Sequence, residues 1–428
     1  MEEYIFPKVL IISHNVLSKT SNMGKTMAQF FGKWESENLA QLYFHSEVPN
    51  LDLCNKYCRI TDFDMLTAVM RCKAKATYFT KNDIQLHIKD TRIDKGFKAD
   101  IYQLGRKQKP YMYVFRNFIW RGKKWKTRKL MDWIDKFNPD VIFYPAGNYC
   151  FSMDIVIDIC KERRLPLVTF FGDEYYFLNT NRNTIFDRIN KKYYHNSFNE
   201  LMKHTSFYIT ASDKMHELYK KEFGGNGCSL LTSTTKAKTP IKNANIKVSY
   251  IGNLGLDRWR PLLEIGRVLK KEGIILDIYS SDMEKSLLSY FTVDNGINFC
   301  GSISAEEVQV VMSASTLLIH VEAMDEINKE KTRYSMSTKI AESLSSGVCI
   351  FAYGPNDIAS IEYLKNNNAA CVVTSRKELE NKLLQVLNDE RLRHKYIKNA
   401  CKLAEKRHND LVNSEKLYEI ITHSCNKS

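Results

Sequence analysis

Apolar residues in the first half of the chain form short continuous runs, separated by segments in which they recur at helical spacing. The runs at residues 8–13, 39–44, 141–144 and 167–171 are largely apolar and of strand length, which predicts buried strands. The segment near residues 152–163 repeats its apolar residues every three or four positions and predicts a helix. Strands that alternate with helices indicate a parallel sheet, so we predict a Rossmann-like α/β domain here.

The same pattern starts again after a polar break. Residues 232–245 carry Pro240 and lack apolar periodicity, so we interpret them as a linker between two domains. Further strand-like runs then alternate with helical segments, at residues 246–251, 275–279, 297–300, 317–321, 348–352 and 370–373. We therefore predict a first domain over residues 1–231, a second over 246–405, and a final helical segment over 406–428.

Length and composition agree with two globular domains in the cytoplasm. A chain of 428 residues can bury a core in each domain. No apolar run approaches the ~20 residues needed to span a bilayer, and the acidic start MEEYIFPKVLIISHN is not a signal peptide. The eleven cysteines are scattered without a C-x-x-C pair, which favours buried thiols in a reducing compartment.

The net charge of +14 is concentrated in one stretch of the first domain. Residues 104–130 hold ten Lys or Arg residues and no acid, interleaved with aromatic residues. The aromatic residues are Tyr111, Tyr113, Phe115, Phe118, Trp120 and Trp125. This composition is typical of a membrane interface or of nucleic-acid binding, but no RNP, KH or helix-turn-helix signature accompanies it.

Two interpretations of this basic aromatic stretch remain. It is either a solvated basic face or a surface, between Arg116 and Leu130, that rests on an anionic membrane with Trp120 and Trp125 at its centre. We expect no nucleic-acid partner. In the second interpretation the protein is cytoplasmic and peripheral on the inner face of the cell membrane.

The densest candidate chemistry lies between residues 317 and 347. A strand-like run is followed by a polar, charged loop and then by a predicted helix over residues 337–346. Ser337 and Thr338 are residue types that cap helices. The helix that they open would present free N–H groups and the positive end of its dipole to an anion.

Charged residues around this helix suit a nucleoside diphosphate. Arg333 and Lys339 offer cations to the phosphates, and Glu342 offers a carboxylate to a ribose diol. The alternative is that Lys339 and Glu342 form an ordinary solvated pair three residues apart. Spacing alone does not decide between these two interpretations.

The run YSMSTKIAESLSSG at residues 334–347 resembles the donor-binding motif of family 4 glycosyltransferases, commonly E-G-F-G-x-x-x-x-E-A-x-A-x-G-x-P. Glu342 matches the second glutamate of that motif, whereas Tyr334 stands in place of the first. The G-F-G turn corresponds to Ser335, Met336 and Ser337. The resemblance implies that these residues contact the sugar nucleotide.

Upstream residues resemble a branch of bacterial surface-polysaccharide transferases. His320, Glu322, Asp325 and Arg333 fit the form H-V-E-x-x-D followed by R-Y-S-x-S-T-K-I-x-E. The resemblance covers most of the chain, strongly after about residue 245 and weakly before it. It places Glu322 and Arg333 among the substrate-binding residues.

A second phosphate-binding loop is predicted after the run at residues 246–251. Gly252 permits close approach of a phosphate between strand and helix, and Arg258 can donate a forked pair of hydrogen bonds to it. Family members often carry G-R at this turn and a lysine five residues later. Here Asn253 takes the arginine's place and Arg258 the lysine's, so one cation is missing unless Arg260, Arg333 or Lys339 replaces it.

The first domain contributes two weaker candidates. Gly24 matches a family glycine that lets a phosphate approach, although an ordinary loop glycine is an equal alternative. A P-loop is excluded here because Lys19 stands where the first glycine of that motif is required. Asp173 follows the run at residues 167–171 and is placed to hold or deprotonate an acceptor hydroxyl. It could instead cap the next helix, and Gly172 replaces the family's histidine.

The resemblance implies the glycosyltransferase-B fold, two Rossmann-like domains facing across a cleft, with the last helix crossing back to the first domain. It further implies a retaining hexosyl- or N-acetylhexosaminyl-transferase that moves a sugar from a UDP- or GDP-linked donor to a polysaccharide or lipid-linked glycan. We expect no cofactor and no metal, because helix amides and Arg258 can neutralise the leaving diphosphate. Asp173, Arg258 and Lys339 are the predicted catalytic residues.

Two rival functions stay open. A nucleotide-sugar 2-epimerase shares this architecture but needs a carboxylate and histidine set that is not evident in the sequence. The second alternative is a non-catalytic nucleotide-sugar-binding protein, because Tyr334 and Gly172 depart from the family pattern.

Overall fold

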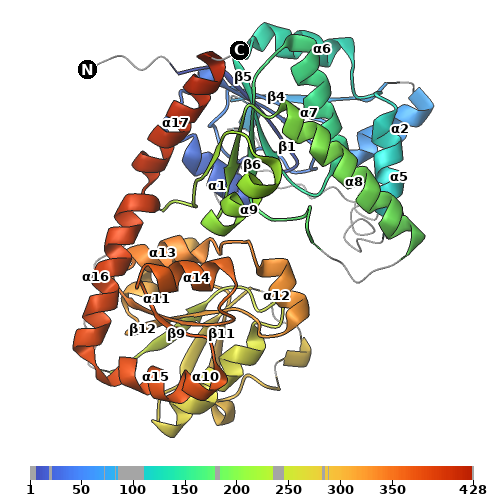
Figure 1. Cartoon of the computed structure of the whole chain (residues 1–428). Helices are drawn as coiled ribbons and strands as arrows, with labels where there is room; N and C mark the ends of the chain where they lie inside the picture. Colours follow the sequence, from blue (N-terminus) through green and yellow to red (C-terminus); the bar gives the residue numbers. More distant parts are fainter. Residues whose placement is uncertain are drawn as a thin grey trace, which may run out of the picture. The chain divides into compact units, whose positions relative to one another are not determined.

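The computed structural model forms two compact units (Figure 1). Unit 1 comprises Met1–Ala211, His216–Ser229 and Ser414–Ser428, and unit 2 comprises Ser212–Met215 and Leu230–Asn413. The structure describes residues 6–18, 22–71, 73–81, 83–84, 110–178, 184–234, 245–281, 285–287 and 289–426. Residues 71–110 are rich in Lys, Asp and Thr, and their sequence predicts an insertion with some local strands. Most of this insertion and most of the expected linker over 232–245 lie outside the described ranges.

Unit 1 is built on an eight-stranded sheet in the order β4-β3-β2-β1-β5-β6-β7-β8, parallel except for the β3–β4 pair. The strands are β1 (Val9–Ser13), β2 (Leu39–Tyr43), β3 (Lys56–Arg59), β4 (Thr77–Thr80), β5 (Val141–Ala146), β6 (Leu167–Phe171), β7 (Phe207–Thr210) and β8 (Gly227–Ser229). The central strands β1, β2, β5 and β6 are fully buried, as their continuous apolar sequences predict. The strand order reverses between β1 and β5, which is the switch point of this sheet.

Helices cover the sheet of unit 1. They are α1 (Asn22–Phe30), α2 (Asp62–Arg71), α5 (Pro110–Arg121), α6 (Arg128–Phe137), α7 (Cys150–Arg163), α8 (Ile185–His204), α9 (Asp213–Phe223) and α17 (Asp410–Asn426). In α6, the Thr127 side chain caps the first turn, and Leu130, Ile134 and Phe137 are buried on one face. In α17, the Ser414 hydroxyl donates to the Phe30 carbonyl at 2.7 Å, so this helix belongs to the core of unit 1 from Ser414 onward.

Unit 2 is built on a six-stranded, fully parallel sheet in the order β11-β10-β9-β12-β13-β14. Its strands are β9 (Val248–Ile251), β10 (Leu276–Tyr279), β11 (Ile297–Gly301), β12 (Leu317–Val321), β13 (Cys349–Tyr353) and β14 (Cys371–Val373). Its helices are α10 (Trp259–Lys271), α11 (Ala305–Ser313), α12 (Glu326–Thr332), α13 (Lys339–Ser345), α14 (Ala359–Asn366), α15 (Arg376–Asn388) and α16 (Glu390–Arg407). The two parallel α/β sheets confirm the predicted fold class.

A buried histidine ties the end of α16 to the chain that enters unit 2. His408 Nδ1 lies 2.7 Å from the Thr232 carbonyl, and the Tyr363 hydroxyl lies 2.9 Å from His408 Nε2. Asn413 donates to the Leu231 carbonyl beside it. Burial lowers the pKa of His408 to about 4, so the ring is neutral at pH 7 and this contact depends on the neutral form.

Among the described residues, no helix is both long and apolar enough to cross a lipid bilayer.

Candidate active site

An arginine and a glutamate meet at the switch point of unit 2, where strand order reverses between β9 and β12. Arg258 ends the loop after β9 and is the N-cap of α10, and Glu322 directly follows β12. The Arg258 Nη2 and Nε atoms lie 3.0 and 3.1 Å from Glu322 Oε2. The side chain of Glu322 is 3% exposed and that of Arg258 is 19% exposed, so the buried carboxylate anchors the more accessible guanidinium.

Two further side chains complete this polar cluster. The Ser360 hydroxyl donates to Glu322 Oε1 at 3.3 Å and lies 3.2 Å from His320 Nε2. That nitrogen is 3.7 Å from the Glu322 carboxylate. Burial lowers the pKa of His320, while the charge of Glu322 opposes the shift. Unit 2 therefore contains a histidine beside a carboxylate. These are the groups that the 2-epimerase alternative needs and that were not evident in the sequence.

Two residues that were predicted to bind phosphate have structural roles in the loop that carries Arg258. A Cβ on Gly252 would lie 2.8 Å from the Tyr250 hydroxyl, so this position requires glycine whether or not a phosphate approaches. The Asn253 side chain accepts a hydrogen bond from the Gly255 amide and its carbonyl accepts one from Tyr250, which makes Asn253 a turn residue. The predicted phosphate contacts of Gly252 and Asn253 stay predictions.

The same loop is held in an uncommon backbone conformation. Leu256 and Asp257 both have φ near +56°, a left-handed region that ordinary side chains avoid. Two consecutive residues of this kind are sustained only when the surrounding structure fixes them. They lie directly before Arg258 and so set where α10 and its N-cap begin.

The structure corrects the predicted start of the donor helix. The helix α13 begins at Lys339 rather than Ser337, spans seven residues, and its N-cap Thr338 makes no side-chain capping bond. Part of the preceding stretch, expected to be a loop, forms α12, which Asp325 caps by accepting from the Asn328 amide at 3.0 Å. Asp325 therefore has a structural role that its polar sequence context did not reveal.

Predicted phosphate-binding cations in this region already pair with acids. Lys339 Nζ lies 2.7 Å from Glu342 Oε2, which is the intrahelical pair that the spacing also allowed. Arg333 lies 2.8 Å from Glu330 and 3.4 Å from Asp357. For either cation to replace the one missing at Asn253, a phosphate must compete with a carboxylate that is already in place.

The residues aligned with the family's G-F-G turn form the connection between α12 and α13. Met336 packs against the core cluster that contains Ile340 and Leu344, and the Ser335 amide donates to the Thr332 carbonyl at 3.1 Å. Tyr334 is half-buried at the start of this connection. Their predicted contacts with a sugar nucleotide stay predictions.

In unit 1, the two predicted residues lie on different elements. Gly24 is buried in α1, where a Cβ would lie 2.5 Å from the Val16 carbonyl, so the backbone itself requires a glycine. Asp173 is exposed after β6, near the Tyr175 hydroxyl at 3.4 Å. The next helix, α8, is capped by Thr184, so Asp173 is not its cap.

Sequence reasoning missed a charged cluster at the carboxyl ends of β1 and β5. Arg116 Nε lies 2.8 Å from Asp62 Oδ1, and its Nη2 lies 2.9 Å from His14 Nε2. The His14 ring stacks on Tyr149 with centroids 3.8 Å apart. Burial, and then the charge of Arg116, lower the pKa of His14 to about 3. A histidine directly after the first buried strand was the available signal in the sequence.

The basic aromatic stretch is more tightly packed than its composition suggests. Trp120 and Trp125 are each 2% exposed, so the expectation that they rest on lipid is wrong. Two of its lysines pair with acids of α7, Lys123 with Asp158 at 2.7 Å and Lys126 with Glu162 at 2.6 Å. The tryptophans belong to the core, and part of the positive charge is neutralised within unit 1.

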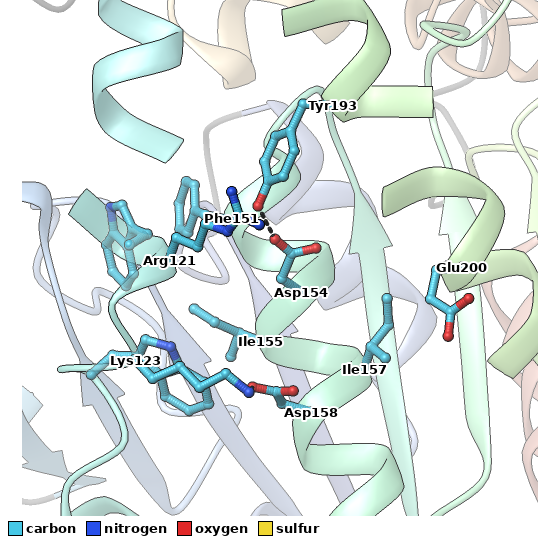
Figure 2. Close-up of a pocket in the computed structure, with 11 residues that line it drawn as sticks. Arg121, Lys123, Phe151, Asp154, Ile155, Ile157, Asp158, Tyr193 and Glu200 are labelled. Atoms are coloured by element: carbon cyan, nitrogen blue, oxygen red, sulfur yellow. Dashed lines mark hydrogen bonds and ion pairs between the residues drawn. The ribbon is translucent and has the colours of Figure 1, made fainter. Parts of the chain in front are cut away.

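A pocket of about 320 Å³ opens between these segments and the helices α7 and α8. Figure 2 shows Tyr193 pointing at Asp154, to which its hydroxyl donates a hydrogen bond. The lining consists of Trp120, Arg121, Lys123, Trp125, Phe151, Asp154, Ile155, Ile157, Asp158, Tyr193 and Glu200. None of the predicted site residues lines it, and we assign it no role in the chemistry.

The described residues contain no group of three or more His, Cys, Asp or Glu side chains placed to hold a metal ion. The sequence includes one D-x-D run, Asp62 to Asp64. The structure accounts for both carboxylates: Asp62 binds Arg116, and Asp64 accepts hydrogen bonds from the amide and hydroxyl of Thr61.

The two parallel sheets, with switch points at β1/β5 and β9/β12, define the glycosyltransferase-B class of fold. No protein-family model matches the sequence, and a search of curated proteins finds no match.

Solved structures of this class share the fold at low sequence identity. Anabaena HepE in complex with UDP is similar with a TM-score of 0.63 and 12% identity, over 97% of this chain and 100% of HepE. Sucrose-phosphate synthase from Thermosynechococcus elongatus has a TM-score of 0.62 and 10% identity, over 98% and 99% of the two chains. A glycosyltransferase from Rickettsia africae has a TM-score of 0.57 and 11% identity, over 99% and 100%. The likeness establishes the fold, and the resemblance to family 4 stays a prediction.

Proposed function

We propose that the protein is a glycosyltransferase that moves a sugar from a nucleotide sugar to a glycan or lipid-linked acceptor. The observation that carries the proposal is the Arg258–Glu322 pair at the switch point of unit 2, because ligands of open α/β sheets bind outside the carboxyl ends of the strands at this point. A fixed guanidinium there suits the diphosphate of a sugar nucleotide. HepE, which shares the fold, has been solved with UDP and with UDP-glucose.

The proposed chemistry rests on neutralising the leaving group. As the glycosidic bond to the nucleoside diphosphate breaks, negative charge grows on the phosphate oxygen, and a cation held in place lowers the barrier. Glu322 occupies the Nε and Nη2 atoms of Arg258 and leaves its Nη1 side for that oxygen. Lys339 would add a second cation after exchanging its partner Glu342, whose carboxylate would then accept from the ribose hydroxyls.

Finer features of the proposal come from the family resemblance. They are retention of configuration, a hexosyl or N-acetylhexosaminyl group, a UDP- or GDP-linked donor, and chemistry without a metal or cofactor. Asp173, exposed after β6, would hold the acceptor hydroxyl. The acceptor would be a bacterial surface polysaccharide or its lipid-linked precursor.

A nucleotide-sugar 2-epimerase is the second candidate, and one observation favours it. His320 and Glu322 lie 3.7 Å apart at the same switch point, and such a pair can move a proton at a sugar carbon. Both side chains are largely buried, and Glu322 is already committed to Arg258 and Ser360. Transfer is therefore the better supported function.

The test is incubation with UDP-glucose, UDP-N-acetylglucosamine and GDP-mannose, followed by chromatography of the nucleotides and of the C2 epimers. Release of UDP or GDP together with the free sugar, in which water takes the place of the acceptor, supports transfer if Arg258→Ala reduces it about 10²- to 10³-fold. C2 epimers with no release support the epimerase. Arg267→Ala, at an exposed position of the same helix α10, is the control. A thermal shift with a nucleotide sugar but no turnover identifies a binding protein. Release that is unaffected by Arg258→Ala contradicts the proposed site.

A further inference from the structure

Two helices of unit 1 expose large apolar side chains. On α5, Tyr111, Phe115 and Phe118 recur at four- and three-residue spacing and are 48%, 57% and 75% exposed. On α8, the exposed residues are Ile185, Phe186 and Ile189, at 69%, 43% and 47%. Contiguous exposed apolar residues of this size mark an interaction site more often than chance exposure does.

The two apolar stripes form one continuous surface. The rings of Tyr111 and Phe186 are 6.4 Å apart, and Asn117 donates to Asn190 across the two helices at 3.2 Å. Figure 1 shows α5 and α8 side by side in unit 1. We call the six apolar residues together the α5–α8 surface.

Cations adjoin the α5–α8 surface. Arg188 and Lys192 share a face of α8 with Ile185 and Ile189 by their spacing, and Lys191 is exposed beside them. Asp187, the acid nearest in sequence, is taken up by the capping box with Thr184.

A fourth exposed cation, Arg121, lies three residues after Phe118 on α5. Within the part of the chain that the structure describes, Arg121, Arg188, Lys191 and Lys192 form no ion pair. The apolar residues thus run along α5 as far as Phe118 and over the first five residues of α8, and the four cations lie beside and after them.

We propose that the α5–α8 surface binds the face of an anionic lipid bilayer. Its aromatic and aliphatic residues would enter the boundary between headgroups and acyl chains, and the four adjoining cations would meet the headgroup phosphates. A second copy of this chain suits the surface less well, because a symmetric contact would bring the same cations together. The surface would hold the protein at a membrane whatever sugar it transfers, and it replaces the buried Trp120 and Trp125 as the contact.

Co-sedimentation of the full chain with vesicles tests the proposal. Vesicles of phosphatidylcholine mixed with phosphatidylglycerol should bind the protein, with affinity falling as salt rises, and vesicles of phosphatidylcholine alone should bind it much less. The double variant Phe115→Ser/Phe118→Ser should weaken binding roughly tenfold or more, because it removes two large apolar side chains that are exposed in the free protein and would enter the bilayer. The control is Val293→Ser/Val310→Ser, at positions of unit 2 that are 61% and 49% exposed.

Charge reversal gives an independent arm. Lys191→Glu/Lys192→Glu should weaken binding to anionic vesicles about 25-fold or more, since each cation near such a surface contributes about fivefold. Lys395→Glu/Lys402→Glu, on the exposed side of α16, changes the net charge equally and should matter far less. If the two double variants lose the same amount of vesicle affinity, net charge alone explains the attraction, and the proposal is overturned.

Two other outcomes also overturn it. Equal binding to neutral and anionic vesicles removes the role of the cations. The other outcome is that the parent protein binds no vesicles and that Phe115→Ser/Phe118→Ser changes the oligomeric state, as measured by analytical ultracentrifugation. That result assigns the surface to a second copy of the chain. Nucleotide release should be unchanged in all four double variants without vesicles, so failure here is distinguishable from failure of the proposed reaction.

Discussion

Glu322 holds Arg258 from the buried side: its carboxylate is 3% exposed and lies 3.0 Å from a guanidinium that is 19% exposed. The pair is anchored at one end and accessible at the other. Removal of the carboxylate should therefore affect the position of the guanidinium as well as local stability.

Glu322→Gln should weaken binding of UDP or GDP about tenfold, because a neutral amide no longer fixes the orientation of Arg258. Calorimetric titration with the nucleoside diphosphate measures the change. The matched control is Glu264→Gln in the same unit, where a carboxylate bonds the Tyr353 hydroxyl at 2.7 Å without contacting Arg258. Equal affinity in the folded Glu322→Gln protein and its parent would remove the pair from the site.

Glu342→Ala should lower nucleoside diphosphate affinity roughly 10- to 150-fold, because a charge-assisted hydrogen bond to the ribose contributes about 1.5–3 kcal/mol. Lys339→Ala should instead lower turnover more than donor affinity, since the leaving diphosphate gains charge in the transition state. A double-mutant cycle for Lys339 and Glu342, followed by calorimetry and initial rates, separates these effects. A coupling below about 0.5 kcal/mol in stability, with unchanged ligand affinity, would identify an ordinary surface pair.

Tyr334→Glu restores the carboxylate of the family motif and should change the transfer rate sharply, since a tyrosine offers only a ring and a hydroxyl in its place. A large gain identifies a site that has lost its first glutamate, and a loss identifies one rebuilt around the tyrosine. Tyr334→Phe should be mild if the ring only stacks. Rates unchanged in both variants would place Tyr334 outside the site.

Gly24→Ala should destabilise unit 1 by roughly 1–3 kcal/mol, because the new methyl group would lie 2.5 Å from the Val16 carbonyl. Urea unfolding followed by circular dichroism measures the loss. Gly122→Ala is the control, since its Cβ would meet nothing closer than 3.8 Å. If Gly24→Ala is as stable as the parent, the packing argument fails and a ligand contact becomes the better explanation for this glycine.

The buried His408 should make unit 2 less stable in acid. Its folded pKa of about 4 lies below the ordinary value of 6.5, so the unfolded chain binds the proton more readily. The stabilisation is complete above about pH 6.5 and is lost as pH falls toward 4, by roughly 3 kcal/mol in all. Hydrogen exchange in peptides from β13 and α16 across this range measures it.

His408→Gln should flatten that dependence, because the amide can still donate to the Thr232 carbonyl but does not titrate. His394→Gln, at an exposed position of α16, should leave it unchanged. An acid dependence that is identical in the parent and His408→Gln proteins would assign it to other groups.

The fold could be predicted from the sequence because its central strands are continuous apolar runs, as in β6 and β13. What escaped prediction was short or polar. β3 has the sequence KYCR and β8 the sequence GCS, neither of which is an apolar run. α12 has the sequence EINKEKT, and its start depends on its Asp325 cap.

The candidate site was predictable only in part. Arg258 and Glu322 were each singled out by local sequence, but they are 64 residues apart in the chain, and only the strand order of the sheet brings them together. His14 and Arg116 are 102 residues apart, and only the packing of α5 in unit 1 brings them together. For Trp120 and Trp125, composition alone suggested exposure, and packing decided otherwise.

The residues of α17 from Ser414 onward belong to unit 1, whereas unit 2 is complete by Asn413. Leu417 and Ile421 in this helix are fully buried, so unit 1 lacks part of its core until they have been synthesised. Unit 1 therefore depends on a segment that is separated from the rest of it in the chain by the whole of unit 2. Removal of residues 414–426 should uncover apolar core in unit 1 while leaving unit 2 intact.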